Sequence, residues 1–317
     1  MNADRSRPFF GYHMPNFTFP GVPDAGLFGR VVELAQAAEA AGFELVTVMD
    51  HFNQIRGVGS EDQPMLEAYS TLAGIAASTK KVRLGTLVTG VTYRNPALLA
   101  KQVTTLDVIS GGRAILGIGA AWNEAEHIGY GFDFPPIGER MDRLAEALTI
   151  CHLMFTEDRP SFAGDHYRID RALNQPRPLQ PRGPQILIGG MGERRTLRLA
   201  AEFADMTHWF AGSLADLRHK TEVLEQHCEA VGRDPSTIVR TIGSPVIPVA
   251  DESQAQAVLE RIAPARRGAL TASTPERAAE RLSTYIEAGF TGFTFGNTML
   301  PTLESIGLAG EVLRLLG

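Results

Sequence analysis

The alternation of strand-like and helix-like segments limits what this chain can fold into more than any other feature of its sequence. Short apolar runs typical of buried strands alternate with segments that carry apolar residues at helical spacing. This order implies parallel strands joined by helical crossovers, and about eight such units predict a (β/α)8 barrel, an α/β fold formed as a single domain over residues 1–317. The predicted strands are Phe9–His13, Glu44–Met49, Val82–Val88, Arg113–Ile118, Gln185–Ile188, Met206–Phe210, Thr237–Val249 and Gly292–Phe295. The predicted helices are Leu27–Ala41, Pro64–Ser78, Pro96–Ile109, Gly138–Phe155, Arg194–Phe203, Asp216–Val231, Ser253–Ile262, Pro275–Ala288 and Thr302–Leu316.

The open, doubly wound alternative needs a glycine-rich phosphate fingerprint after the first strand. Met14-Pro15-Asn16 follows that strand and does not supply one. Gly117-Ile118-Gly119 is not a dinucleotide fingerprint either, because Trp122 stands where the third glycine would be.

Composition narrows the class of function. The 317 residues are 44% hydrophobic with a net charge of −6, so we expect a soluble protein with no nucleic-acid partner. Cys151 and Cys228 are too few and too far apart for a disulfide framework, which fits a reducing cytoplasm. We expect no signal peptide, because residues 1–8 are polar, and no membrane partner, because no apolar run is long enough to span a bilayer.

One segment interrupts the alternation. Glu157–Gly183 is rich in Pro, Arg, Gly and Asp, and it is too long for an ordinary loop. Within it, Phe162–Tyr167 has the pattern of a short hairpin. We therefore expect an insertion in the barrel.

Active sites of (β/α)8 barrels lie at the C-terminal ends of the strands. His51 directly follows the second strand, and histidine exchanges protons near neutral pH, so it is the first candidate for catalysis. Asp50 could orient the imidazole or contact a cofactor. The alternative is a rim histidine that only hydrogen-bonds to a neighbouring loop.

Two further strand ends suggest a bound cofactor. After the strand Arg113–Ile118, the small residues Gly119, Ala120 and Ala121 would let a flat ligand lie against the backbone, although a buried strand with a plain turn has the same pattern. Gly189–Arg194 resembles a phosphate cradle, because glycine-rich backbone at a helix start offers free N–H groups and a positive dipole end. A simple strand-to-helix turn is the alternative there.

Four motifs together resemble the luciferase-like monooxygenase family, in particular its deazaflavin-dependent branch. They are Val88–Ala97, Leu106–Arg113, Leu116–Glu126 and Gly138–Leu148. The similarity runs over nearly the whole chain and is densest from Val82 to Leu148. It implies an oxidoreductase that transfers a hydride between coenzyme F420 and a small organic substrate. An FMN-dependent monooxygenase of the same fold and a non-catalytic flavin-binding or partner-binding protein are the alternatives.

The resemblance also implies roles for particular residues. It gives His51 the role of proton donor or acceptor, places a cofactor phosphate at Gly189–Arg194, and places a non-proline cis peptide at Leu87–Val88. The luciferase branch has an arginine for FMN phosphate where this chain has Ala120, which favours the deazaflavin. The expected catalytic residues are His51 and Asp50, and the expected cofactor-binding residues are Leu87, Val88, Thr89, Gly119, Ala120, Ala121, Trp122, Asn123, Gly189, Gly190, Met191, Gly192, Glu193, Arg194, His208 and Trp209.

The family further implies a homodimer and an insertion beside the mouth of the site. We expect substrate contacts from Asn53–Gln63 and from Glu157–Gly183. No metal site is expected, because His219, His227 and Cys228 do not have the spacing of metal ligands on their helix. His127, with Glu124 and Glu126 beside it, is expected to position a loop.

Overall fold

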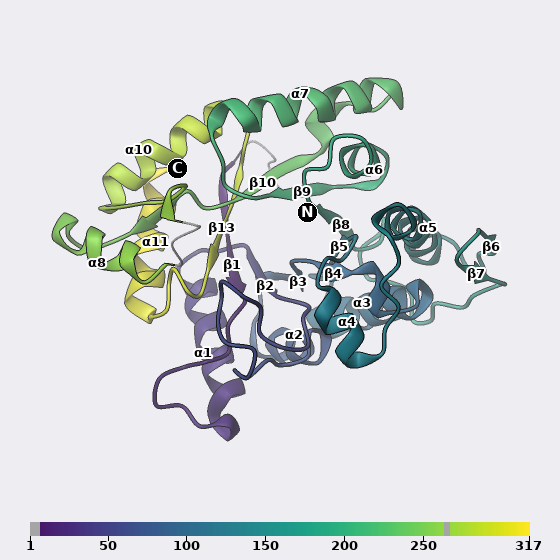
Figure 1. Ribbon diagram of the computed structural model, residues 1–317, viewed down its shortest axis with the longest axis horizontal. Helices are drawn as coiled ribbons and strands as arrows, with labels where there is room; N and C mark the ends of the chain where they lie inside the picture. The colour runs from purple at the N-terminus through teal and green to yellow at the C-terminus, as the bar shows by residue number, and fades with distance from the viewer. Residues whose placement is uncertain (1–6, 263–266) are drawn as a thin grey trace.

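The computed structural model describes residues 7–262 and 267–317, and within them the chain forms a closed parallel barrel (Figure 1). The hydrogen-bonded order of the strands is β3-β2-β1-β13-β10-β9-β8-β5-β4. A parallel bridge between Leu84 of β3 and Ala114, the residue directly before β5, closes this sheet. The predicted (β/α)8 barrel is thus confirmed. The bounds are β1 (Phe9–Met14), β2 (Leu45–Val48), β3 (Arg83–Thr86), β4 (Thr89–Gly90), β5 (Ile115–Gly119), β8 (Gln185–Gly189), β9 (Met206–Trp209), β10 (Val239–Gly243) and β13 (Gly292–Gly296).

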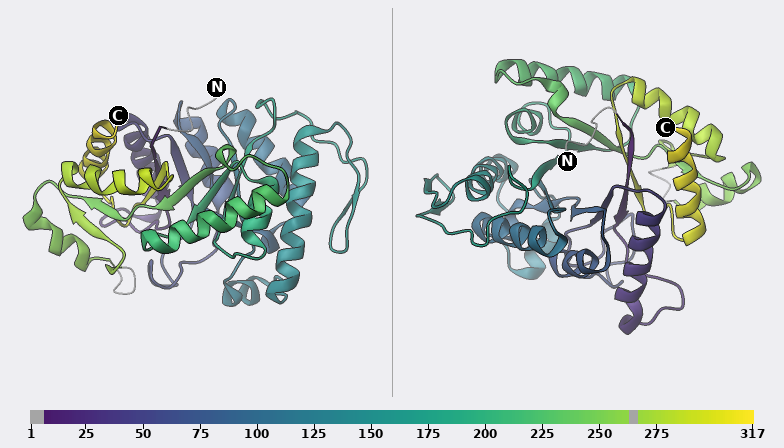
Figure 2. Two further views of the ribbon diagram at one scale, coloured as in Figure 1. Left: turned by 90° about the horizontal axis from the view of Figure 1, so that it is seen from above. Right: turned by 180° about the vertical axis from the view of Figure 1, so that it is seen from behind.

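Helices surround the strands on the outside of the barrel (Figures 1 and 2). Their ends follow local capping: Asn95 accepts a hydrogen bond from the Ala97 N–H at the start of α3, and Gly111 ends that helix at a φ of 70°. The helix predicted from Pro64 begins only at Ala68, because the Glu67 carboxylate caps it there. The bounds are α1 (Leu27–Ala40), α2 (Ala68–Ser78), α3 (Pro96–Ser110), α4 (Glu124–Tyr130), α5 (Ile137–Thr156), α6 (Thr196–Phe203), α7 (Leu214–Ala230), α8 (Ala255–Glu260), α10 (Pro275–Glu287) and α11 (Leu303–Leu315), with short 3-10 turns at Asp24–Gly26, Val91–Tyr93, Pro235–Thr237 and Glu252–Gln254.

The predicted strand Thr237–Val249 is in fact two strands. Pro245 lacks an N–H and follows β10, and the chain then leaves the barrel as β11 (Val246–Pro248). β11 pairs with β12 (Thr271–Ser273) in a separate parallel ribbon.

The insertion forms the expected hairpin, from β6 (Phe162–Ala163) and β7 (Arg168–Ile169). The Glu146 carboxylate on α5 accepts hydrogen bonds from the N–H groups of Asp165, His166 and Tyr167 and holds the hairpin turn. The segment therefore lies along the outside of α5 (Figure 2). Its ends join the end of α5 to the start of β8, which is the end of the barrel where strands begin.

The barrel interior is filled at one end and open at the other. Five large side chains, one from each of five strands, form a small inner core, on which Leu87, Val88 and Val239 pack: Phe9, Leu45, Ile115, Leu187 and Met206. Two residues further along these strands, where the side chains again point inward, most positions are small: Gly11, Thr47, Gly117 and Gly189. This change in size leaves a hollow at the C-terminal ends of the strands.

Candidate active site

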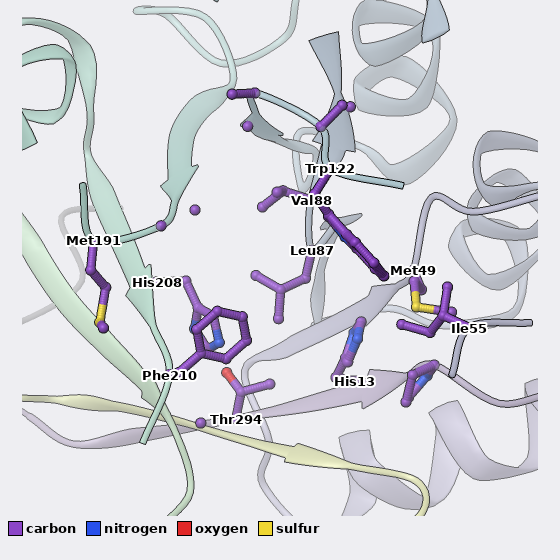
Figure 3. Close-up of a pocket in the computed structure, with 18 of the residues that line it drawn as sticks. His13, Met49, Ile55, Leu87, Val88, Trp122, Met191, His208, Phe210 and Thr294 are labelled. Carbon is purple, nitrogen blue, oxygen red and sulfur yellow. The ribbon is translucent and has the colours of Figure 1, made fainter. Parts of the chain in front are cut away.

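A cavity of about 1280 Å³ occupies this hollow. It brings together sixteen of the residues expected to form the site, from strand ends far apart in sequence: Asp50, His51, Leu87, Val88, Thr89, Gly119, Ala120, Ala121, Trp122, Gly189, Gly190, Met191, Gly192, Glu193, Arg194 and His208. Leu87 lies in the middle of the cavity wall, between the side of Trp122 and the side of His208 (Figure 3).

The peptide bond between Leu87 and Val88 is cis, as the family resemblance implied. Val88 lies against Gly119 of β5 and Gly189 of β8, and a Cβ at either glycine would be 3.0 Å from a Val88 methyl group. The glycines at these strand ends therefore let the third strand bulge into the barrel between β3 and β4. The bulge puts two apolar side chains on the inner wall of the cavity.

A carboxylate that the sequence did not identify holds His51. Glu126 Oε2 accepts a hydrogen bond from His51 Nδ1 at 2.7 Å and another from the Tyr93 hydroxyl at 2.5 Å, while Oε1 accepts the Phe52 N–H. Burial raises the pKa of Glu126, but the hydrogen bonds from His51 and Tyr93 outweigh it, so the pKa lies below its usual range and the carboxylate stays ionised. An ionised carboxylate only accepts, so Nδ1 carries the proton and Nε2 is left to exchange one with a ligand.

Asp50 has a different partner from the one expected. Both of its oxygens bind the Arg94 guanidinium, at 2.6 and 3.0 Å, and Arg94 also binds Glu67 at 2.8 Å. Asp50 borders the cavity but makes no hydrogen bond to the His51 ring among the described residues. Of the two roles expected for Asp50, orienting His51 is corrected, because Glu126 does so; a contact between Asp50 and the cofactor stays a prediction.

His208 provides a second imidazole on the opposite side of the cavity. Its Nδ1 lies 2.8 Å from Thr241 Oγ1, and that hydroxyl donates its own proton to the Thr207 carbonyl. The Thr241 hydroxyl can therefore only accept from His208, which leaves Nε2 of His208 as a hydrogen-bond acceptor. Burial lowers the pKa of His208 to about 4, so the ring is neutral at physiological pH.

Two residues expected at the site do not line the cavity. Trp209 follows His208 on β9, so its side chain points to the opposite face, where it is fully buried edge-on to Phe290. Asn123 caps α4, its side chain accepting from the Glu126 N–H at 3.4 Å. By capping this helix, Asn123 helps to place Glu126 under His51.

The turn between β8 and α6 has the features of an anion site. Over the described residues, the N–H groups of Met191, Gly192, Glu193 and Arg194 donate to no protein acceptor. Gly190 has a φ of 112°, and a Cβ at Gly192 would lie 2.9 Å from Thr196 Oγ1. Backbone donors are thus free beside a helix start, and a side chain at Gly192 would crowd Thr196, the first residue of that helix.

Several lining residues were not anticipated from the sequence. They include Met49, Phe210, Thr294 and Met299. Ile55–Val58, within the expected substrate loop Asn53–Gln63, do line the cavity, but none of residues 157–183, all of which the structure describes, does so. The insertion therefore does not border this cavity.

No group of three or more His, Cys, Asp or Glu side chains in the described ranges could hold a metal ion. His127 bonds Thr92 and the Asn123 carbonyl, at 2.6 Å each, which matches its expected positioning role. In the same ranges, every helix is too short or too polar to cross a bilayer.

Comparison with known proteins gives consistent matches. Residues 9–282 match the family model described as luciferase-like monooxygenase. An F420-dependent glucose-6-phosphate dehydrogenase of Kineococcus radiotolerans is 36% identical over 219 residues, which are 68% of this chain and 62% of that protein. An uncharacterised protein of Mycobacterium tuberculosis is 28% identical over 70% of this chain and 74% of its own length.

Solved structures match over almost the whole chain. An F420-dependent secondary alcohol dehydrogenase, in complex with an F420-acetone adduct, has a TM-score of 0.81 at 21% identity and covers 98% of this chain and 99% of its own. A long-chain alkane monooxygenase has a TM-score of 0.81 at 18% identity, covering 98% and 91%. At these sequence identities, the similarity to the solved structures shows a shared fold and no more. The alignments to the first curated relatives span about half to three-fifths of those proteins.

Proposed function

The chain belongs to the luciferase-like monooxygenase family, and on that premise we propose that it is an oxidoreductase that uses coenzyme F420 to move a hydride to or from a small organic substrate. The observation that carries the proposal is one cavity with a proton-exchanging group and an anion site at different strand ends: His51 held by Glu126, and the glycine turn after β8. The curated relatives named as F420-dependent dehydrogenases support the choice of cofactor.

The residues present fit such a cofactor. When bound, F420 supplies a ring carbon that accepts or gives up a hydride. The free N–H groups of Met191–Arg194 would hold its phosphate, and Leu87 and Val88 would support its ring from behind. His51 Nε2 would take or return the proton of the substrate, with Glu126 keeping the imidazole in the required tautomer. Gly119, Ala120 and Ala121 would leave room for the ring edge.

FMN is the alternative cofactor, since the family also contains monooxygenases. At Ala120 this chain has no cation for an FMN phosphate, which supports F420. A non-catalytic binding protein is the further alternative, and the ordered His51–Glu126 pair argues against it, because mere binding does not need a fixed tautomer.

Titration of the purified protein with each cofactor tests the proposal. We expect F420 to bind more tightly than FMN, with the dissociation constants measured by calorimetry under the same conditions. Tight binding of FMN with no binding of F420 would reject the deazaflavin and favour oxygen chemistry.

A homodimer in the cytoplasm is also part of the proposal, and it rests on the family resemblance and the composition. Light scattering of the purified protein would test the dimer: a single species with the mass of one chain would contradict it.

A further inference from the structure

The cavity is larger than one ligand needs. Pockets for a single small molecule usually measure about 300–1,000 Å³, and this cavity measures about 1280 Å³. The anion site, which is the turn between β8 and α6, lies at one side of the cavity and suits the cofactor. The space beside His51 therefore remains for a second molecule.

Apolar side chains surround that space. Met49, at the end of β2, and Ile55, on the loop after it, line the cavity with Val58. The Trp122 side chain extends toward Met49 and Ile55 (Figure 3) and lies edge-on to the His51 ring at 5.5 Å. Trp122 is 60% exposed although it faces a cavity, so a ligand there would cover a large aromatic surface.

Except for Arg56 and Arg194, which are exposed, the charged residues that line the cavity are paired within the described part of the chain. Asp50 is bound by Arg94, and Arg94 also by Glu67. Glu126 is bound by His51. On the anion side, Lys220 is paired with Glu193 and Arg195 with Asp142. Arg56 lies exposed on the loop, where it remains hydrated, so the described lining offers no buried cation beside His51 for a second phosphate.

We propose, resting on the proposed function, that the substrate is an uncharged alcohol or carbonyl compound with an apolar body, bound against Met49, Ile55 and Trp122 with its oxygen toward His51. A phosphorylated sugar does not suit this space. In the direction of oxidation, the carbinol C–H bond breaks and its hydride goes to F420. The O–H proton goes to His51 Nε2, and the carbon–oxygen double bond forms. Reduction reverses each transfer.

Tryptophan fluorescence tests this without turnover. The chain has two tryptophans, and Trp209 is fully buried, so a change in emission on ligand binding reports Trp122. We expect 2-octanol to shift the emission to shorter wavelength with a saturable midpoint, both with and without F420, and glucose 6-phosphate to leave it unchanged. Trp122→Phe should abolish the response. A response to glucose 6-phosphate, or none to 2-octanol, overturns the inference.

Substitutions at Ile55 and Arg56 test whether the space beside His51 binds an uncharged, apolar ligand. Ile55→Lys should raise the 2-octanol midpoint by about tenfold or more while F420 affinity stays within about twofold, and Ile55→Gln gives a milder version if the lysine variant does not fold. Arg56→Ala should change the midpoint by less than about twofold. If Arg56→Ala abolishes 2-octanol binding, Arg56 and not the apolar wall of Met49, Ile55 and Trp122 holds the ligand, and the inference fails. Because these midpoints are also measured without F420, failure of the cofactor proposal would leave them unaffected and be seen separately.

Discussion

His51 is the side chain on which the proposed chemistry depends most directly. His51→Ala and His51→Asn should both fold and bind F420 within a few-fold of the wild type, since neither change touches the anion turn. The hydride-transfer step should slow by about 10²-fold or more, the usual scale for losing general acid–base help. Single-turnover F420 reduction with an apolar secondary alcohol measures this. Near-normal rates for His51→Asn would show that His51 only positions another group.

Glu126 acts through His51, so we expect it to be a positioning residue. Glu126→Gln keeps the volume but loses the charge that fixes the Nδ1 proton, and should slow the same step by about tenfold, less than the loss of the imidazole itself. Glu126→Asp should recover part of the rate. Equal losses for Glu126→Gln and His51→Ala would instead place Glu126 in the chemistry.

The same carboxylate makes stability depend on pH. Folding lowers the pKa of Glu126. The contribution of this carboxylate to the free energy of unfolding is therefore fully present above the unfolded pKa, about 4.3, and is lost as pH falls through the folded pKa. Chemical denaturation should therefore show wild type and Glu126→Gln differing most near pH 7 and converging in acid. A difference that grows on acidification would contradict the ionised carboxylate.

Among the elements, the turn from β8 to α6 is the one on which the proposed binding of F420 depends most. Gly192→Asp would place a carboxylate among the free N–H groups and should weaken F420 binding by about fivefold or more, because like charges a few Å apart cost about 1 kcal/mol or more. Gly192→Ala is the matched control: its Cβ also approaches Thr196 Oγ1 but carries no charge, so the loss should be smaller. An unchanged dissociation constant for the aspartate variant would remove this turn from the site.

The elements also show what sequence reasoning can and cannot reach. Buried strands can be recognised in the sequence because each is a local run of apolar residues. The glycine that ends α3 can be recognised too, because its signal is also local. The helix α4 was missed because it is only seven residues long and partly polar. The role of Glu126 was missed because its partner lies 75 residues away. Strand alternation, on the other hand, would have excluded Trp209 once His208 was assigned to the cavity.

At the scale of the whole molecule, the barrel converts separate strand ends into one site. The sequence predicted the ring of strands and therefore which ends would meet. The sequence did not predict that Asp50 would form an ion pair with Arg94, since that pair depends on how the loop after β4 folds next to the end of β2. For the same reason the insertion was misplaced: chain order alone does not say which end of the barrel a long αβ connection covers.

Because the cavity is built from strands all around the barrel, cofactor binding should stabilise the entire fold. At a free F420 concentration of about 100 times the dissociation constant, binding to the native state adds about 2.7 kcal/mol, which corresponds to a rise in Tm of about 4 °C for a chain of this size. Differential scanning fluorimetry at one fixed concentration should give a smaller rise with FMN than with F420. It should also give a smaller rise with F420 for Gly192→Asp than for the wild type. Equal rises for the two cofactors would mean that the cavity does not distinguish them, and an undiminished rise for Gly192→Asp would mean that the cofactor is held elsewhere in the barrel.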